Sequence, residues 1–486
     1  MTPHEEIAAL KAENAALRGQ VQALVTRVQE LEGRLAKDSH NSSKPPASDG
    51  LARKPKSLRQ KSGKKPGGQP GHRGRHLRLV AQPDIVIAHR PTTCGTCHAP
   101  LPAQAWSWVE RRQVHELPPL RLVVTEHQIA HVRCRACRAT TRGQAPDGVQ
   151  APVQYGPRLR ALAVYLVQQQ FLPYARAREL LADVVGAPLG VGTLVSLVRC
   201  GADRLGRLEE QIKRQLRRAA VLHHDETGLR VTSSRSATGE RPAAAGAALQ
   251  WAHVTSTPQL THYALHAQRG AAALETIGIL PRFRGVSMHD GWTAYRHYHR
   301  CRHALCNAHH LRELTFLEEE LHQPWAGQLK HLLREMHSAV EQARAAGLTQ
   351  LPTAQRAGFR SRYEALLGAG VAANPQPPPS AAPRRRGRRK QSPARNLLDR
   401  LWTYEDEVLL FLDDFAVPFD NNQAERDLRM VKVQQKISGT FRSSTSAHAF
   451  CRLRSVLSTW RKQGRSGLNA LETVFAGQPL ALQVGT

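Results

Sequence analysis

Three short acidic segments constrain the fold of this chain more than any other feature of its sequence. Asp225 closes an apolar run that begins at Ala219, and Asp290 follows a second run, residues 285–288. Short apolar runs of this kind predict strands, whereas the residues around Glu425 predict the start of a helix. Carboxylates that meet from two strand ends and one helix can hold two divalent ions about 3.5–4 Å apart, an arrangement suited to in-line displacement at phosphorus.

The charge of the chain indicates a polyanionic partner. Its 486 residues include 69 Lys and Arg but 39 Asp and Glu, which gives a formal net charge of +30. A surplus of this size favours nucleic acid as the partner and says nothing about the fold. The length predicts three or more domains. We expect no membrane partner, because the sequence lacks an apolar run of about 18 residues and its charged start is unlike a secretory signal.

Residues 1–40 are predicted to form a leucine-zipper coiled coil. Leucines recur at every seventh position, and a second, mostly β-branched series lies between them. This pattern favours a parallel homodimer, or a higher oligomer, in which Asn14 fixes the register. The alternative is a single amphipathic helix that packs on its own chain. The two series are Leu10, Leu17, Leu24 and Leu31, and Ile7, Asn14, Val21, Val28 and Leu35.

Residues 41–85 are predicted to be a basic, disordered linker. Ten Lys or Arg lie between Arg53 and Arg78 with no acidic residue among them, and Pro and Gly are frequent. Such a composition prevents a packed core. The linker can act as an arm that contacts DNA phosphates, or it can be a solvated connection between domains.

Two Cys-x-x-Cys pairs predict a zinc-binding ribbon over residues 86–145. Cys94 and Cys97, together with Cys134 and Cys137, can bring four thiolates to one tetrahedral Zn²⁺. Alternating segments between the pairs, such as residues 120–125, predict short β-strands. A pair of redox motifs is the alternative, but neither pair lies in a βαβ context. We therefore expect one structural zinc ion.

Residues 150–217 are predicted to form a helical, helix-turn-helix-like DNA-binding domain. One helix begins at Tyr174 and is stopped by Gly186, and a second begins at Val191. Short helices joined by a glycine-containing turn are typical of this motif, although many other helix pairs share the pattern. On the second helix, Thr193 and Ser196 are the candidates for contacts with DNA bases.

The remainder of the chain is predicted to carry the chemistry. Residues 218–440 would form a catalytic domain with a helical insertion at about 305–410, and residues 441–486 would form a C-terminal helical segment. Strands are expected at 221–225, 249–254 and 261–265, and a helix at 271–280.

Six longer motifs run from the N-terminal region to residue 426. They are NSSKPP at 41–46, GQPGHRG at 68–74, DET at 225–227, HDGW at 289–292, CNAHHLREL at 306–314 and DNNQAER at 420–426. These motifs resemble those of the DDE transposases of bacterial insertion sequences, specifically insertion-sequence family sixty-six. The resemblance implies a multidomain α/β protein whose RNase H-like catalytic core carries a helical insertion. It also implies double-stranded DNA partners (terminal inverted repeats and a target), accessory proteins of the same element, and a cytoplasmic location on the bacterial nucleoid.

The resemblance further implies that Asp225, Asp290 and Glu425 are catalytic and hold Mg²⁺, or Mn²⁺ in its place. An all-oxygen ligand set suits Mg²⁺, which keeps water and shares phosphate ligands. Charge alone does not distinguish Asp225 from Glu226, since neighbouring residues of a strand face opposite sides. The resemblance selects Asp225.

The leading hypothesis is therefore a transposase that cleaves DNA in a metal-dependent step and transfers the freed strand. The alternatives are a catalytically inactive DNA-binding regulator derived from a transposase, and an RNase H-fold nuclease that cuts without strand transfer.

Two further features are less specific. Arg429, Lys432 and Lys436 recur on one face of the helix that carries the third acid, so they can bind phosphate or form a solvated face. Cys306 and His309 match a C-x-x-H motif of several DDE families. A second zinc site and a role in helix packing are both open for this pair.

Overall fold

The computed structural model describes most of the chain beyond residue 64. It covers residues 65–232, 247–376 and 391–483, apart from 66, 75–76 and 104–108. Within the first 64 residues it covers 10, 13–14, 17–18, 20–21, 24, 28, 31–33 and 35–42. Much of the predicted coiled coil and of the basic arm therefore lies outside the described residues. No helix in the described ranges has both the length and the apolar composition that crossing a bilayer requires.

A five-stranded mixed sheet forms the centre of the structure. Its strands are β3 (Val221–Thr232), β4 (Ala247–Ser256), β5 (Thr261–His266), β6 (Val286–His289) and β7 (Arg302–Leu305). Their order is β5-β4-β3-β6-β7. The first three form an antiparallel meander, whereas β6 and β7 run parallel to β3. This topology is consistent with the expected RNase H-like core.

The pairing of β3 with β6 depends on a close approach at Gly285. The N–H of Val286 donates to the Ala220 carbonyl at 2.8 Å, where the chain enters β6. A Cβ atom at Gly285 would lie 2.4 Å from the same carbonyl oxygen, closer than a side chain tolerates. Glycine therefore allows the two strands to pair in this register, in which His223 faces Met288.

Two helices cover one face of the sheet. Helix α13 (Asn422–Ser438) packs on β3 and β4, and α14 (Ser444–Lys462) packs on β5. Apolar residues that alternate along the strands meet apolar residues of these helices in one buried cluster. Its members include Leu229, Val231, Val254, Tyr263, Leu428, Val431 and Phe450.

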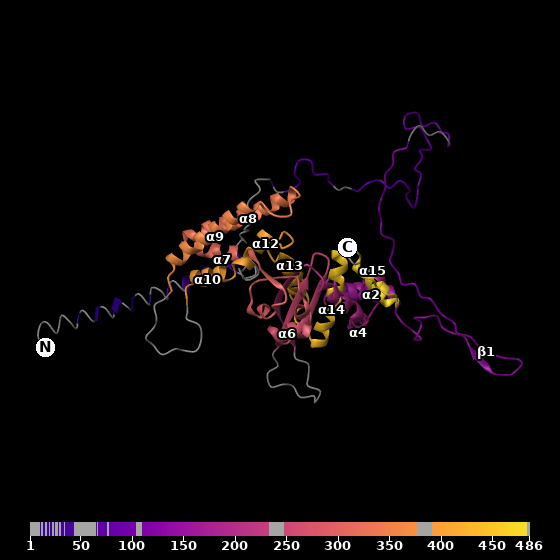
Figure 1. Cartoon of the computed structure of the whole chain (residues 1–486). Helices are drawn as coiled ribbons and strands as arrows, with labels where there is room; N and C mark the ends of the chain where they lie inside the picture. The colour runs from indigo at the N-terminus through magenta and orange to yellow at the C-terminus, as the bar shows by residue number, and fades with distance from the viewer. Residues whose placement is uncertain are drawn as a thin grey trace.

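The helices between β7 and α13 form a layer with its own core, where the helical insertion was expected (Figure 1). They are α7 (Asn307–Glu319), α8 (Pro324–Ala345), α9 (Thr353–Ala373), α10 (Pro393–Thr403), α11 (Glu405–Val408) and α12 (Leu410–Asp413). The sequence explains where α10 begins, because the Ser392 hydroxyl accepts from Arg395 N–H at 3.1 Å and Pro393 starts the helix. Residues of β6 and β7, such as Met288 and Leu305, join this core.

Four helices that precede the sheet share their core with the last helices of the chain. They are α2 (Pro157–Gln168), α3 (Tyr174–Val185), α4 (Val191–Arg204) and α5 (Gly206–Leu216). Helix α3 has the predicted bounds, because Gly186 ends it in the left-handed conformation with φ 67°. Helix α4 begins at the predicted Val191 and continues to Arg204. Helix α4 packs on α14, and α15 (Gly467–Phe475) packs on α2.

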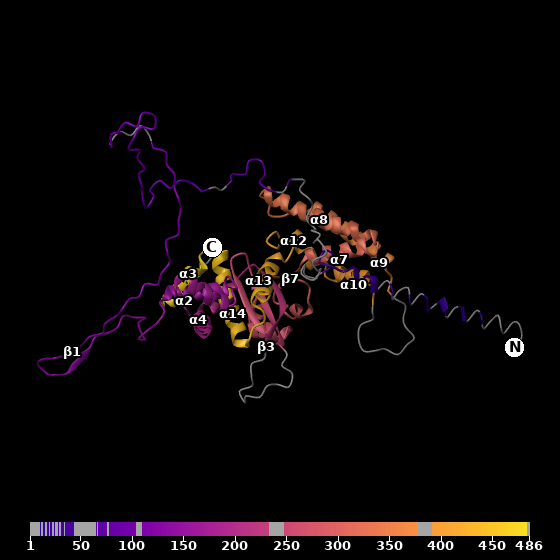
Figure 2. The ribbon, with the colours of Figure 1, turned by 180° about the vertical axis from the view of Figure 1, so that it is seen from behind.

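The described residues between 77 and 150 extend away from the sheet and helices (Figures 1 and 2). The described strands in this segment are β1 (His131–Arg133) and β2 (Thr140–Arg142), which pair antiparallel. The strand expected at 120–125 is not formed, so that prediction is wrong. Alternation stabilises a strand when one face is buried, and here Val123 and Val124 are 86% and 89% exposed.

Gly285→Ala should destabilise the protein, because the added methyl group would overlap the Ala220 carbonyl. We expect the free energy of unfolding, measured by urea denaturation, to fall by about 1–3 kcal/mol, the usual cost of an overpacked site. Gly358→Ala is the matched control, since it lies in α9 with open space around its new Cβ. It should be neutral or stabilising by about 0.5–1 kcal/mol, because alanine favours a helix. Wild-type stability for Gly285→Ala would contradict the close approach.

Candidate active site

Two neighbouring strands bring Asp225 and Asp290 to the same level of the sheet. His223 pairs with Met288, and each acid lies two residues further along its chain. Neighbouring strands are about 4.7–4.9 Å apart, so the backbones of Asp225 and Asp290 lie side by side. The chain turns directly after the second acid at Gly291, which has φ 93°. The pairing of β3 and β6 thus sets the spacing of these two acids.

Glu425 reaches the same place from α13. It lies in the first turn of this helix, which packs on β3 and β4. Burial, the adjacent Glu226 and the charges of Asp290 and Glu425 raise the pKa of Asp225 well above its usual range. The negative charges of Asp290 and Glu425 therefore act on Asp225 and repel its ionised form, although the oxygens of the three carboxylates do not all lie within 4.8 Å of one another. A divalent cation among them would remove this repulsion, and their all-oxygen donor set fits Mg²⁺.

Comparison with known families identifies the chain. The profile described as Transposase IS66 family matches residues 152–449, which is more than half of the chain and includes all three acids. The chain belongs to the IS66 transposase family. Residues 2–78 match a family of unknown function, DUF6444. No curated protein matches the chain. The protein is thus a DDE transposase, one of a class of DNA-binding enzymes that generally use divalent metal ions.

In this transposase the two adjacent acids of β3, Asp225 and Glu226, point to opposite faces of the sheet. The buried Glu226 carboxylate accepts hydrogen bonds from Arg269 at 2.6 and 2.8 Å and from the Tyr295 hydroxyl at 2.5 Å. Arg269 also stacks on Trp292, with its guanidinium carbon 4.3 Å from the ring centroid. Because protein groups occupy both its oxygens, Glu226 supports the strand, which favours Asp225 as the metal ligand. Sequence reasoning missed these partners, which lie 43 and 69 residues from Glu226.

Buried histidines lie on the Glu226 side of the transposase sheet. His289 stacks on Tyr295 with 4.7 Å between centroids, and its Nε2 lies 3.0 Å from His303 Nδ1. Burial lowers the pKa of His224 to about 3 and the pKa of His289 well below its usual range. These rings are therefore neutral near pH 7, and they contribute packing and hydrogen bonds rather than charge.

Asn421 ties the start of α13 to the sheet of the transposase. This residue is 1% exposed. Its N–H donates to Cys306 Sγ at 3.1 Å, its Nδ2 donates to the His224 carbonyl at 2.7 Å, and its Oδ1 accepts from His223 Nδ1 at 3.0 Å. These bonds hold the first turn of α13, and with it Glu425, against β3.

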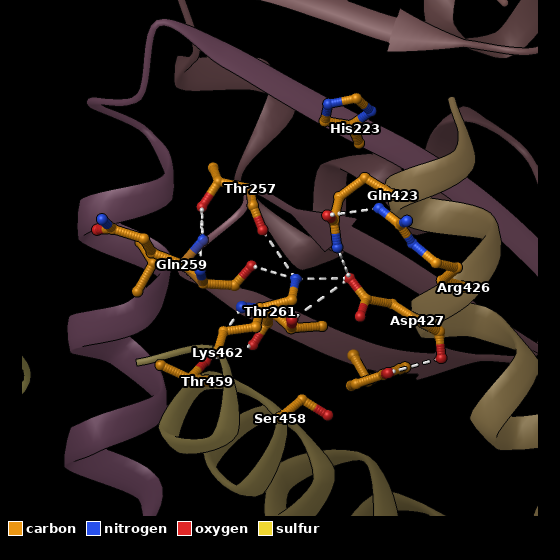
Figure 3. Close-up of polar contacts among 12 residues, drawn as sticks. His223, Thr257, Gln259, Thr261, Gln423, Arg426, Asp427, Ser458, Thr459 and Lys462 are labelled. Atoms are coloured by element: carbon orange, nitrogen blue, oxygen red, sulfur yellow. Dashed lines mark hydrogen bonds and ion pairs between the residues drawn. The ribbon is translucent and has the colours of Figure 1, made fainter. Parts of the chain in front are cut away.

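A partly buried ion pair holds a later position of α13 against α14 (Figure 3). Asp427 lies 2.6 Å from Lys462 Nζ, and it also accepts from Gln423 at 3.0 Å and Thr261 at 3.4 Å. Lys462, on α14, donates as well to two backbone carbonyls of the turn between β4 and β5. Because Asp427 follows Glu425 by two residues, this network fixes the helix that presents the third acid.

The residues predicted to contact DNA lie on two separate helices of the transposase. Arg429, Lys432 and Lys436 are exposed on α13, and Lys432 Nζ also donates to a backbone carbonyl of β3 at 2.7 Å. On α4, Ser196 is exposed and Thr193 is half-buried. Helix α4 packs on α2, α3, α14 and α15, so these two residues lie outside the acid cluster.

The two Cys-x-x-Cys pairs form similar turns. In each turn the N–H of the first cysteine, Cys94 or Cys134, donates to the carbonyl five residues further on, at 2.9 and 2.8 Å. The residue after the second cysteine is left-handed in both, with φ 57° at His98 and 60° at Arg138. Hydrogen bonds from backbone groups lower the pKa of Cys94 to about 7 and also lower the pKa of Cys134. The described residues do not unite the two pairs into one metal-ligand group, so the zinc ribbon stays a prediction.

Asp427→Asn should lower the free energy of unfolding by about 1–3 kcal/mol, because it leaves the partly buried Lys462 ammonium without its counter-charge. Adding Lys462→Met should restore much of that stability, since it removes the unpaired charge. Chemical denaturation measures both effects.

Asp414→Asn is the control for this experiment. Asp414 pairs with Arg302, whose side chain is 60% exposed, so the change should cost less than about 1 kcal/mol. If Asp427→Asn lowers the free energy of unfolding no more than the control does, the Asp427–Lys462 pair does not anchor α13.

Proposed function

We propose that the protein is an active transposase that binds the terminal inverted repeats of its insertion sequence and cuts and joins DNA there. The observation that supports this proposal is the electrostatic effect of Asp290 and Glu425 on Asp225. Burial and the surrounding carboxylates raise the pKa of Asp225 well above its usual range. Acids gathered in this way destabilise one another until a cation joins them. The net charge of +30 supplies the attraction for DNA.

The chain's own contribution to the chemistry is to orient the carboxylates. One oxygen of Asp225 accepts from the Glu226 N–H at 2.8 Å, and one oxygen of Asp290 accepts from the Trp292 N–H at 2.9 Å. These bonds fix the angle at which each acid would hold Mg²⁺ or Mn²⁺. When bound, two such ions would activate the attacking oxygen and stabilise the leaving oxygen of an in-line displacement.

The proposed reaction consists of two displacements at phosphorus. In the first, a water oxygen attacks the phosphodiester at the element end, the bond from phosphorus to the 3′ oxygen breaks, and that oxygen leaves as a 3′-hydroxyl. In the second, this hydroxyl attacks a phosphodiester of the target, a new P–O bond forms, and the target strand releases its own 3′-hydroxyl. One set of oriented carboxylates serves both steps, because the attacking and leaving oxygens are in line in each.

Asp225→Asn, Asp290→Asn and Glu425→Gln should each abolish cleavage of element-end DNA while DNA binding survives. Each change removes a negative charge at nearly constant volume, and losing electrostatic stabilisation of this kind costs at least about 10²–10³-fold in rate. Labelled end duplexes report cutting and joining. Mn²⁺ should replace Mg²⁺, and Ca²⁺ should support binding without cleavage.

The control for these variants is Asp406→Asn, because the Asp406 side chain is 94% exposed on α11. It should cut at the wild-type rate. Any acid variant that also cuts at that rate would remove its residue from the site. Cutting without joining would indicate a nuclease, and no cutting in any metal would indicate an inactive regulator.

We propose that DNA is held by two kinds of contact. Exposed cations on α13, Arg429 and Lys436, together with Lys432, would bind phosphates that flank the cut. The exposed face of α4, with Ser196 and the half-buried Thr193, would contact bases of the inverted repeat. The first kind of contact supplies affinity for any DNA, and the second supplies preference for the element end.

Ser196→Ala should therefore lower the preference for the inverted repeat over random DNA by about 1–3 kcal/mol. Thr193→Ala should act in the same direction but more weakly, since it is half-buried. Arg429→Ala should weaken binding to both DNAs alike and reduce the salt dependence by about one phosphate contact. Binding isotherms on both DNAs at several salt concentrations separate these effects. An equal loss on both DNAs for Ser196→Ala would assign α4 a structural role.

We also propose one structural Zn²⁺ at Cys94, Cys97, Cys134 and Cys137. The matching turns of the two pairs support this assignment, because both present thiols whose pKa is lowered by hydrogen bonds from backbone groups. A segment with few buried apolar residues gains most from a metal that supplies folding free energy.

The first 40 residues are proposed to join two copies of the chain. Every described position from Leu10 to Ala36 is helical, and the apolar ones of the heptad pattern are between 42% and 79% exposed. A second copy of the same helix would cover this face in a parallel dimer. Accessory proteins of the same element remain a prediction from the sequence.

A further inference from the structure

Cys306, His309 and Glu425 gather where α7 and α13 begin. Cys306 directly precedes α7, His309 lies in the first turn of that helix, and Glu425 lies in the first turn of α13. Their ligand atoms, a sulfur, a ring nitrogen and a carboxylate oxygen, all lie within 4.8 Å of one another. Within the described residues, no other group of three or more His, Cys, Asp or Glu side chains meets this spacing.

Two polar atoms of this group are buried without a hydrogen-bond partner. They are His309 Nδ1 and Glu425 Oε1, which lie 3.9 Å apart. A hydrogen bond between them would need about 3 Å, and an unsatisfied buried polar atom is costly. Two ligands of one tetrahedral ion, each about 2.0–2.2 Å from it, lie about 3.3–3.6 Å apart, so a small rotation of either side chain would bring both atoms to one ion. One ion would therefore satisfy both atoms.

The third ligand is already oriented by the protein. Cys306 is 1% exposed, and its Sγ accepts from the Asn421 N–H at 3.1 Å. Because Asn421 directly precedes α13, this bond holds the sulfur beside the helix of Glu425. The His309 and Glu425 side chains remain 17% and 23% exposed, which leaves an open side through which an ion can enter.

We propose that Cys306, His309 and Glu425 bind a thiophilic divalent ion of the Zn²⁺ class. Sulfur and imidazole nitrogen are ligands that Zn²⁺ prefers, whereas Mg²⁺ takes oxygen. A thiolate and a carboxylate together neutralise the charge of the ion, and a neutral imidazole adds none. Three protein ligands leave a fourth position for solvent or an exogenous ligand.

This site is distinct from the proposed all-carboxylate site, although it shares Glu425 with it. The inference needs these three side chains to bind metal, and it does not need Glu425 to be catalytic. Both oxygens of Glu425 lie near residues of α7: Oε1 is 3.9 Å from His309 Nδ1, and Oε2 is 3.8 Å from Arg312. An ion at this site would hold Oε1 against α7.

Cobalt is the probe for this site, because Co²⁺ occupies zinc sites and its bond to a thiolate gives a charge-transfer absorption band. The full-length protein is used with serine at the four ribbon positions, so that the predicted ribbon adds no band. Its thermal transition, compared with wild type, verifies folding. We expect about one equivalent of Co²⁺ to bind with a thiolate band, and Zn²⁺ to displace it. The substituted residues are Cys94, Cys97, Cys134 and Cys137.

Cys306→Ser should abolish the band, and His309→Ala should weaken Co²⁺ binding by at least about tenfold. Cys301→Ser is the matched control, because Cys301 is buried at the opposite end of β7 and its thiol donates to the Tyr298 carbonyl at 3.2 Å. It should keep the band. Asp290→Asn should also keep the band while losing cleavage, which separates this inference from the proposed function.

A folded protein without a thiolate band would overturn the inference. A band that survives Cys306→Ser, or one that disappears in Cys301→Ser, would do the same. If the four-serine protein does not fold, the wild-type chain takes its place. Cys306→Ser must then bind about one equivalent of Co²⁺ less than wild type, and equal counts would overturn the inference.

Discussion

The pairing of β3 with β6 is the constraint on which the rest of the structure depends. It is short, running from Val221 opposite Val286 to His223 opposite Met288, and the absence of a side chain at Gly285 permits it. Side chains alternate along a strand, so a shift of one residue would turn the first acid toward the buried histidines and turn its neighbour toward α13. One register therefore decides which acid meets the other two and which residues of β6 enter the core of the insertion.

Local sequence patterns predicted much of the fold. The α3–turn–α4 arrangement follows from Gly186, the start of β3 at Val221 follows from an apolar run, and the start of β5 at Thr261 has the predicted position. The sequence did not reveal that β3 continues to Thr232, where it pairs with Ala247 of β4. The end of β3 and the start of β4 are hydrogen-bonded to each other, and neither segment shows a strong strand pattern in the sequence. Residues 120–125 show the reverse case: their sequence has a strand pattern, but no strand forms because neither face is buried.

The three candidate acids could be predicted, because each lies in a distinctive motif beside a strand or at the start of a helix. The groups that hold these acids in place could not be predicted. Asn421 has partners 115 to 198 residues away, and Glu226 has partners 43 and 69 residues away. Contacts between such distant segments leave no periodicity in the sequence. They also have a separate physical role. Apolar contacts hold α13 on the sheet, whereas the buried hydrogen bonds of Asn421 and Asp427 specify its rotation and its position along the strands.

The core that α2 and α4 share with α14 and α15 has a consequence for biosynthesis. Translation at about 5–20 residues per second separates the emergence of Pro157 from that of Phe475 by roughly 15–60 s. During that interval Gly201 of α4 has no Phe475 ring against it, and the apolar face around Leu194 has no C-terminal cover. A ribosome that stops early therefore releases a chain with exposed apolar surface, which chaperones and proteases act upon. The topology therefore requires the C-terminal helices before the core around α2 and α4 can be completed.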